Sequence, residues 1–186
     1  ADVDNYNTAV GYAAGGDVTT GIQNTLVGGL AGDALTDADS NVAIGYSALT
    51  ADTLGSQSVA IGHSALGSQN FTTATSANNT AVGFYAGLNI TTATYSTIVG
   101  AQAGDAITTG ANNTIMGGKA GSGLTTGSNN VAFGYNALNA DDVGSKSTAI
   151  GAQALLTQNY STATDSHNTA VGYHSGLYLT TGTHNT

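Results

Sequence analysis

The sequence predicts an all-β protein, a parallel β-solenoid of about ten 17-residue coils with a 21-residue coil every fifth. The motif Asn-Thr-Ala-Val-Gly-Tyr, first seen at Asn7–Tyr12, returns along the whole chain. Its glycines follow one another at steps of 17 residues, except for steps of 21 residues from Gly62 to Gly83 and from Gly151 to Gly172. The full set is Gly11, Gly28, Gly45, Gly62, Gly83, Gly100, Gly117, Gly134, Gly151 and Gly172. No helical periodicity is sustained, and a fixed period is typical of repeat architectures whose units contact only their neighbours.

Each copy of the motif is expected to form a short strand. Side chains alternate along a strand, so Thr8, Val10 and Tyr12 point one way while Ala9 and Gly11 point the other. β-branched residues suit the strand, and Gly and Asn suit corners where φ is positive. A second, weaker polar strand, often Thr-Thr-Gly, follows in each coil. With a spacing of about 4.8 Å between strands, ten such coils span roughly 48 Å.

The first motif residue is always Asn or Ser, which predicts a ladder of stacked polar side chains. Amides in such a column can bond up and down the stack. The expected Asn ladder consists of Asn7, Asn24, Asn41, Asn79, Asn113, Asn130 and Asn168, and Ser58, Ser96 and Ser147 fill the remaining places.

A longer period of 89 residues, equal to four short steps and one long step, divides the chain into two five-coil blocks, about 7–95 and 96–184. Positions 41–97 and 130–186 share 33 identities in 57 aligned pairs. We therefore expect residues 1–186 to be a single solenoid segment. The last two residues begin another copy of the motif, so we expect this segment to belong to a longer chain.

The 21-residue coils carry a four-residue insertion at the same place in each block, within residues 68–75 and 157–164. Insertions in solenoids map to loops on one face, which is often the binding face. We favour an enlarged corner that packs on a neighbouring coil over a ligand-binding loop. If the loops do recognise a ligand, the candidate residues are Asn70, Phe71, Thr73, Asn159, Tyr160 and Thr162.

Composition argues against several classes of partner. The net charge is −9, and the only basic residues other than histidine are Lys119 and Lys146. Nucleic acids and anionic membrane surfaces both require a basic footprint, so neither is expected as a partner. No apolar run approaches the roughly 20 residues of a membrane helix, so this segment is not expected to insert into a membrane. Cysteine is absent, which rules out a disulfide.

The sequences Ser58–Gly62 and Asn41–Gly45 resemble the head repeats of trimeric autotransporter adhesins. The longer form Asn-Thr-Ala-Val-Gly-Tyr-x-Ala-Gly is similar to repeats in tail fibres of aquatic bacteriophages and in bacterial surface proteins. The adhesin resemblance implies a left-handed parallel β-roll, three chains per head, and second and fourth motif residues facing a threefold axis, although the adhesin repeat is shorter than the repeat of this chain. The implied axis-facing set is Val10, Val27, Val42, Ile44, Val59, Ile61, Val82, Val99, Met116, Val131, Phe133, Ile150 and Val171.

A physical argument independently favours a homotrimer. A thin coil with Ala, Gly and Asn inside buries little apolar area, and an exposed Val/Ile column would run along the whole rod. Burying such a side chain contributes about 1.5–3 kcal/mol, and long apolar patches are rare on monomers. The alternative is that the column faces the inside of the coil and the chain is monomeric.

No catalytic constellation stands out, so we expect no enzyme activity, no cofactor and no metal site. His63, His167, His174 and His184 are expected to be surface residues. The close carboxylate pairs that sugar-cleaving β-helices need are represented only by residues 37/39 and 141/142, which we interpret as solvated corners. Gly15-Gly16-Asp17 lacks the period of a calcium-binding repeat, and Asp33 and Asp105 form only a sparse column.

Two surface patterns remain open. Ice-binding rods display Thr-x-Thr on a flat face, and the form Thr-Ala-Thr occurs at residues 73–75, 92–94 and 162–164, in only three of ten coils. The column after the motif glycine includes Tyr12, Tyr46, Phe84, Tyr135 and Tyr173, which can stack on sugars or pack between protomers. We favour packing.

The function expected from these patterns is a structural and adhesive fibre segment, a rigid trimeric rod on an extracellular adhesin or filament. The alternative is the shaft or receptor-binding segment of a phage tail fibre, and the second alternative is an ice-binding solenoid. The expected partners are further copies of the chain and a host-surface glycan or protein receptor. The expected location is extracellular, on a cell surface or a virion.

Overall fold

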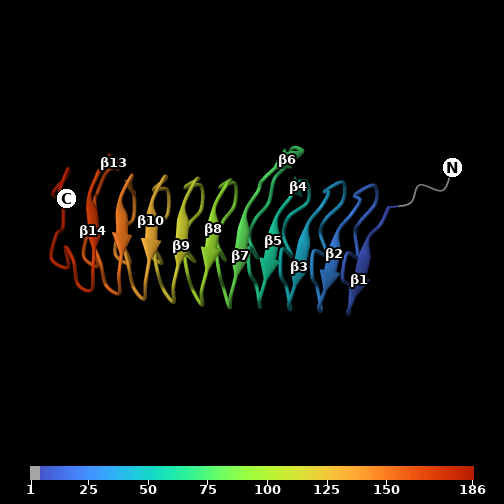
Figure 1. Cartoon of the computed structure of the whole chain (residues 1–186). Coiled ribbons are helices and arrows are strands. Elements are labelled where there is room, and N and C mark those ends of the chain that lie inside the picture. Colours follow the sequence, from blue (N-terminus) through green and yellow to red (C-terminus); the bar gives the residue numbers. More distant parts are fainter. Residues whose placement is uncertain (1–4) are drawn as a thin grey trace.

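A computed structural model describes residues 5–186, and these form one continuous β-solenoid (Figure 1). Successive coils stack along a single axis, with the N-terminal strand at one end and the C-terminal residues at the other. The described residues contain no helix. The predicted parallel β-solenoid, with about ten turns at a spacing of about 17 residues, is confirmed.

One sheet of ten short parallel strands runs the length of the rod, and its order follows the chain. Each strand covers the second to fourth motif residues, and each pairs in register with the next coil, as Thr8 does with Thr25. The strands are β1 (Thr8–Val10), β2 (Thr25–Val27), β3 (Val42–Ile44), β5 (Val59–Ile61), β7 (Thr80–Val82), β8 (Thr97–Val99), β9 (Thr114–Met116), β10 (Val131–Phe133), β12 (Thr148–Ile150) and β14 (Thr169–Val171).

The second strand expected in every coil is regular only beside the insertions. There β4 (Gly55–Ser56) pairs with β6 (Thr75–Ser76), and β11 (Gly144–Ser145) pairs with β13 (Thr164–Asp165). β6 projects beyond the line of the other corners (Figure 1). Elsewhere this side of the coil consists of turns and bends, so the expectation of a second strand in each coil was wrong.

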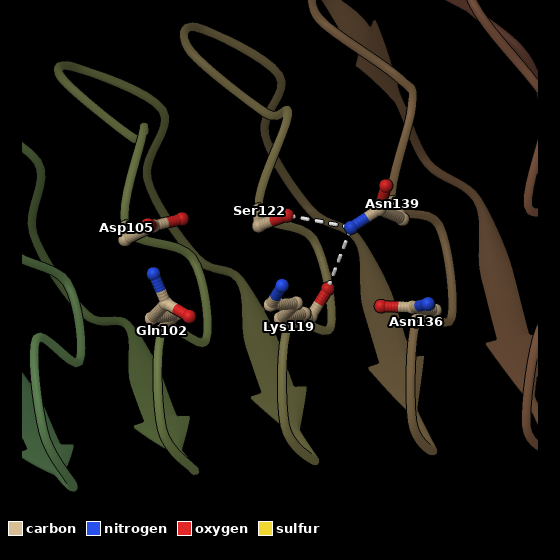
Figure 2. Close-up of a pocket in the computed structure, with 6 residues that line it drawn as sticks. All are labelled: Gln102, Asp105, Lys119, Ser122, Asn136 and Asn139. Carbon is tan, nitrogen blue, oxygen red and sulfur yellow. Dashed lines mark hydrogen bonds between the residues drawn. The ribbon is translucent and has the colours of Figure 1, made fainter.

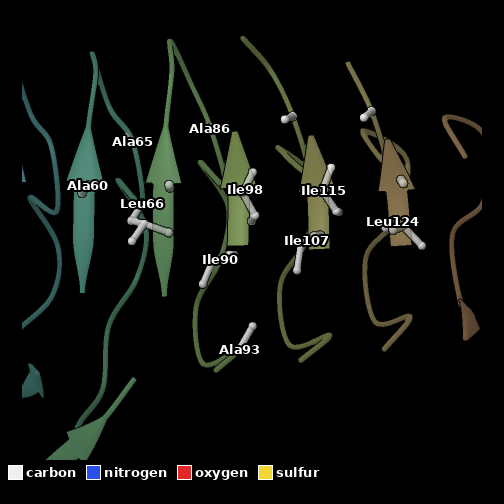
Figure 3. Close-up of a cluster of buried hydrophobic side chains, with 14 of the residues drawn as sticks. Ala60, Ala65, Leu66, Ala86, Ile90, Ala93, Ile98, Ile107, Ile115 and Leu124 are labelled. Carbon is white, nitrogen blue, oxygen red and sulfur yellow. The ribbon is translucent and has the colours of Figure 1, made fainter. Parts of the chain in front are cut away.

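The interior is more apolar than Ala, Gly and Asn alone would make it. The third motif residue points inward, and buried Leu and Ile side chains from the strand and from the far wall fill each coil (Figure 3). The fully buried ones are Leu26, Leu35, Leu49, Leu66, Ile90, Ile98, Ile107, Ile115, Leu124, Leu138 and Leu155. Each chain therefore has its own core before any assembly.

The position that contributes a large side chain to the interior differs from coil to coil. Where the strand contributes a small Ala60, the residue six positions later is Leu66. Where the strand contributes Leu26, that position is Gly32. A Cβ on Gly32 would lie 2.8 Å from carbons of both Leu26 and Leu35. A coil that already holds these two leucines therefore has no room for a side chain at the position of Gly32.

Four positions in each coil adopt positive φ, and apart from the motif glycine many of them are not Gly or Asn. Leu66 (φ 50°), Tyr95 (φ 56°) and Lys119 (φ 56°) are examples. The left-handed conformation costs about 1–2 kcal/mol for an ordinary residue. Here it directs each N–H along the rod axis onto the neighbouring coil, as from Tyr95 N to Ala77 O at 2.9 Å. The inter-coil hydrogen bonds offset the strain.

The Asn column is buried, but its hydrogen bonds differ from an amide ladder. The Asn24 Nδ2 donates to the carbonyl of Ala38 at 2.8 Å, and the Asn24 Oδ1 accepts from the backbone N–H of Asn41 at 2.9 Å. The same pair of side chain–backbone bonds recurs in the other Asn coils. An amide-to-amide bond occurs between Asn185 and Asn168 at 3.0 Å. The column joins neighbouring backbones rather than neighbouring amides.

Candidate functional site

The fourth motif residues form an apolar column that faces away from the coil interior. We call it the outer column: Val10, Val27, Ile44, Ile61, Val82, Val99, Met116, Phe133, Ile150 and Val171. Phe133 is 51% exposed on the single chain, and Val10 and Val171 at the two ends are 58% and 65% exposed. The alternative that this column fills the inside of the coil is wrong, because the third motif residue occupies that space. Its place on a threefold axis stays a prediction.

The second motif residue shares the side of the strand on which the outer column lies, and the sixth motif residue follows just after the strand. Val42, Val59 and Val131 are half-buried there. At the sixth position Tyr12, Tyr46, Phe84, Tyr135 and Tyr173 are exposed. His63 lies between Tyr46 and Phe84, with ring centroids 5.3 and 5.5 Å away. The outer column and these aromatic rings together form an apolar outer face along the rod.

The two aromatic residues of the insertions are not displayed on the surface. Phe71 is 6% exposed and Tyr160 is 5% exposed, so their assignment as surface-recognition residues is corrected. The insertion lets each ring turn back into the coil. A Cβ on Gly55 would lie 2.8 Å from Phe71 Cδ2, and the Tyr160 hydroxyl donates to the carbonyl of Gly182 at 2.7 Å. This geometry agrees with the enlarged-corner interpretation, and Asn70, Thr73, Asn159 and Thr162 remain exposed.

A buried carboxylate accompanies each insertion. Asp52 accepts hydrogen bonds from Gln69 Nε2 at 2.6 Å and from the N–H of Gly55 at 3.0 Å. Asp141 accepts the matching pair from Gln158 and Gly144 at 2.6 and 3.0 Å. Both carboxylates are fully buried, so the interpretation of Asp141 as a solvated corner was wrong.

Burial raises the pKa of Asp141, while hydrogen bonds from Gln158 and Gly144 act in the opposite direction. The sequence carried a signal for this feature. In both blocks an Asp is followed three positions later by Gly and one coil later by Gln. The two carboxylates lie inside the coils, out of reach of any substrate, so their role is structural.

A polar hollow of about 350 Å³ opens across three neighbouring coils (Figure 2). Within it Asn139 Nδ2 donates to Ser122 Oγ at 2.6 Å and to the carbonyl of Lys119 at 3.0 Å. Burial raises the pKa of Asp105, and its backbone hydrogen bonds and the charge of Lys119 lower it in part. The lining residues are Gln102, Asp105, Lys119, Ser122, Asn136 and Asn139. The sequence patterns did not reveal this set, although its members recur at the coil period.

The remaining chemical candidates do not converge on a site. Within residues 5–186, no group of three or more metal-ligating side chains could hold an ion. His167 and His184 stack on each other with ring centroids 5.0 Å apart, and His174 hydrogen-bonds Gln153. No helix in the described part of the chain is long and apolar enough to cross a membrane.

Thr-x-Thr does not form a flat array. Thr75 and Thr164 sit on the short strands of the insertions, where each hydroxyl donates to a carbonyl two residues back, at 2.9 and 2.8 Å. They pair with Gly55 and Gly144 in the neighbouring coils, so the Thr-x-Thr residues of the insertions do not stack on further threonines.

The chain matches no protein-family model, no curated protein and no solved structure.

Proposed function

We propose that this chain is a structural and adhesive segment, a rigid rod that assembles as a homotrimer in an extracellular fibre. One observation carries the proposal: the apolar outer face, which runs from β1 to β14 and points away from a core that is already filled. A single chain satisfies its own interior, so the outer column has no packing role within that chain.

The energetics favour covering this face. Contiguous apolar patches larger than a few hundred Å² are rare on monomeric proteins, and an uninterrupted stripe of this kind marks an interaction surface. Complete burial of each Val, Ile or Phe contributes about 1.5–3 kcal/mol, before the loss of translational and rotational freedom is subtracted. Identical chains side by side and in register would place like residues together at every coil, so three copies can cover the stripe around one axis.

The segment fits two classes of fibrous protein: a bacterial surface adhesin or filament, and a phage tail fibre that reaches a host receptor. Both classes place the rod outside a cell, and both require a stiff rod with a repeated surface for attachment. The resemblance of the repeat motif to adhesin heads and to tail fibres supports either class. Other domains on the same polypeptide would distinguish them: a coiled-coil stalk with an outer-membrane anchor would indicate the adhesin, and a tip domain would indicate the tail fibre.

The solution mass from light scattering tests the assembly. A trimer has three times the 18.2 kDa mass of the single chain. Phe133→Asp should dissociate it, because a charge would be buried on the axis, whereas an exposed substitution on a monomer changes stability by only about 0.5 kcal/mol or less. Tyr95→Asn is the control, since Tyr95 is an exposed corner residue and Asn112 already occupies that corner in the next coil. A stable 18.2 kDa monomer for the unmodified chain would refute the trimer.

A further inference from the structure

The polar hollow of Figure 2 belongs to the second block only. Its lining residues have equivalents one block earlier, at Ala13, Gly16, Leu30, Asp33, Ser47 and Thr50. The backbone conformation is the same in both blocks: Lys119 and Leu30 have φ of 56° and 58°, and Asn136 and Ser47 have φ of 55° and 52°. The bond between Asn139 and Ser122 has a counterpart between Thr50 and Asp33. The coil geometry does not require Gln102, Asp105 and Lys119, because their counterparts are an alanine, a glycine and a leucine.

Two observations show that the hollow contains unused polar groups. Asn136 Oδ1 is buried and has no hydrogen-bond partner, the sole buried side-chain atom of this kind among residues 5–186. Buried polar atoms are nearly always paired, so an exception marks a place where a partner is missing. In addition, Asp105 and Lys119 line the same hollow without forming an ion pair, since the one salt bridge among the described residues joins Lys146 to Asp165.

The chemistry of the lining selects the class of ligand. No side chain in it is apolar, so an apolar molecule gains little there. The positive charge of Lys119 opposes a metal cation, the carboxylate of Asp105 opposes an anion, and together the two charges sum to zero. The Asp105 carboxylate and Asn136 Oδ1 accept hydrogen bonds, while Lys119 and the amide of Gln102 donate them. Hydroxyl groups, which both donate and accept, satisfy this combination.

We propose that the hollow binds a neutral polyhydroxylated ligand, a neutral sugar residue of a glycan. Its hydroxyls would donate to Asp105 and accept from Lys119, and rotation of the Asn136 amide toward the hollow would bring its buried, unpaired Oδ1 to a third hydroxyl. At about 350 Å³ the hollow lies at the lower end of the range of ligand pockets, roughly 300–1,000 Å³, which suits a single small sugar unit. The biological meaning of this site rests on the proposed attachment function, but the binding itself does not require the trimer.

The first experiment screens the labelled protein against immobilised neutral, sialylated and sulfated oligosaccharides, with EDTA present throughout. The best neutral glycan is then titrated by calorimetry. Lys119→Leu and Asn136→Ser each introduce the residue that the first block already carries at the same corner, so the fold accommodates them. Each should weaken binding about tenfold, the effect of losing one hydrogen bond to the ligand. Ser47→Asn, the reverse exchange in the first block, is the control and should leave the affinity unchanged.

A second experiment builds the site where it is absent. Replacing Ala13, Gly16, Leu30, Asp33, Ser47 and Thr50 with the residues found at the same places in the second block should raise the stoichiometry from one to two glycans per chain. Absence of binding to every neutral glycan overturns the proposal, as does binding only to acidic glycans or equal binding by Lys119→Leu and Asn136→Ser. The mass of each variant separates the two proposals. Loss of binding in an intact trimer would refute the glycan site but not the trimeric rod, and binding by a monomer would refute the trimer but not the site.

Discussion

Asn79→Ala tests whether the polar column holds the coils together. The buried Asn79 side chain donates from Nδ2 to Gln69 Oε1 at 2.8 Å and to the carbonyl of Ala93 at 2.7 Å. Its Oδ1 accepts from the N–H of Ser96 at 3.0 Å. Alanine removes the partner of all three groups and puts nothing in its place.

The magnitude follows from these three contacts. A buried polar group left without a partner costs about 1–3 kcal/mol, so three groups near the lower part of that range cost about 3–6 kcal/mol in the free energy of unfolding. Asn79→Ser should cost about half as much. Serine already occupies this column at Ser96, where its hydroxyl accepts from the N–H of Asn113 at 3.3 Å, so it preserves the bond to the next coil. It cannot reach the carbonyl of Ala93.

Urea denaturation followed by circular dichroism measures the effect, at one fixed protein concentration so that the proposed assembly contributes equally to every variant. Hydrogen exchange at the amide of Ser96 locates it, since that N–H loses its acceptor. Asn159→Ala is the control: Asn159 is exposed, and its replacement should change the free energy of unfolding by about 0.5 kcal/mol or less. If Asn79→Ala is no more destabilising than this control, the column does not join the coils and the reasoning is wrong.

Three further predictions concern the interior. Leu66→Ala should lower the free energy of unfolding by about 2–5 kcal/mol, because the buried side chain leaves a cavity between coils that already carry Ala on the strand; thermal denaturation measures it. Gly45→Ala should prevent folding of that coil, seen as loss of the solenoid circular-dichroism signal, because a Cβ there would lie 2.5 Å from the Gly62 carbonyl oxygen, which is backbone and cannot move aside. Burial raises the pKa of Asp141 above its ordinary value of 3.8, so the folded state binds the proton more tightly than the unfolded state. The stability of the unmodified chain relative to Asp141→Asn should therefore increase as pH falls from neutral through the folded-state pKa, and an opposite trend in urea midpoints contradicts the assignment.

The repeat period predicts the coils because stacking requires the same residue type at the same place in every turn. Asn24 and Asn41 recur as one column, and the strands begin where the motif places them. Alternation along the strand also predicts correctly that Val10 and Ala9 point to opposite sides. The period alone, however, does not say which side is the interior, because both the third and the fourth positions carry apolar residues in several coils.

The features that the sequence did not predict depend on contacts between different positions of the repeat, within one coil or between neighbouring coils. The exchange between Leu26 with Gly32 and Ala60 with Leu66 keeps the interior filled while individual columns look irregular. The inward turn of Phe71 depends on the missing side chain at Gly55, one coil earlier in the chain. The polar hollow depends on which corner side chains lie together across three coils, which a comparison of successive repeats does not reveal.

The direction of the inter-coil hydrogen bonds has a mechanical consequence. Each strand pairs only with the coils before and after it, so the bonds lie along the rod rather than across it. Tension between the two ends of one chain pulls these bonds apart in sequence instead of shearing many at once. At about 3.5 Å per extended residue, each released short coil would lengthen the chain by about 60 Å of contour, and each coil with an insertion by about 14 Å more. A single molecule under tension should therefore lengthen in a repeating series of four equal steps and one longer step. A filament of such rods would dissipate a sudden force by unfolding one coil at a time.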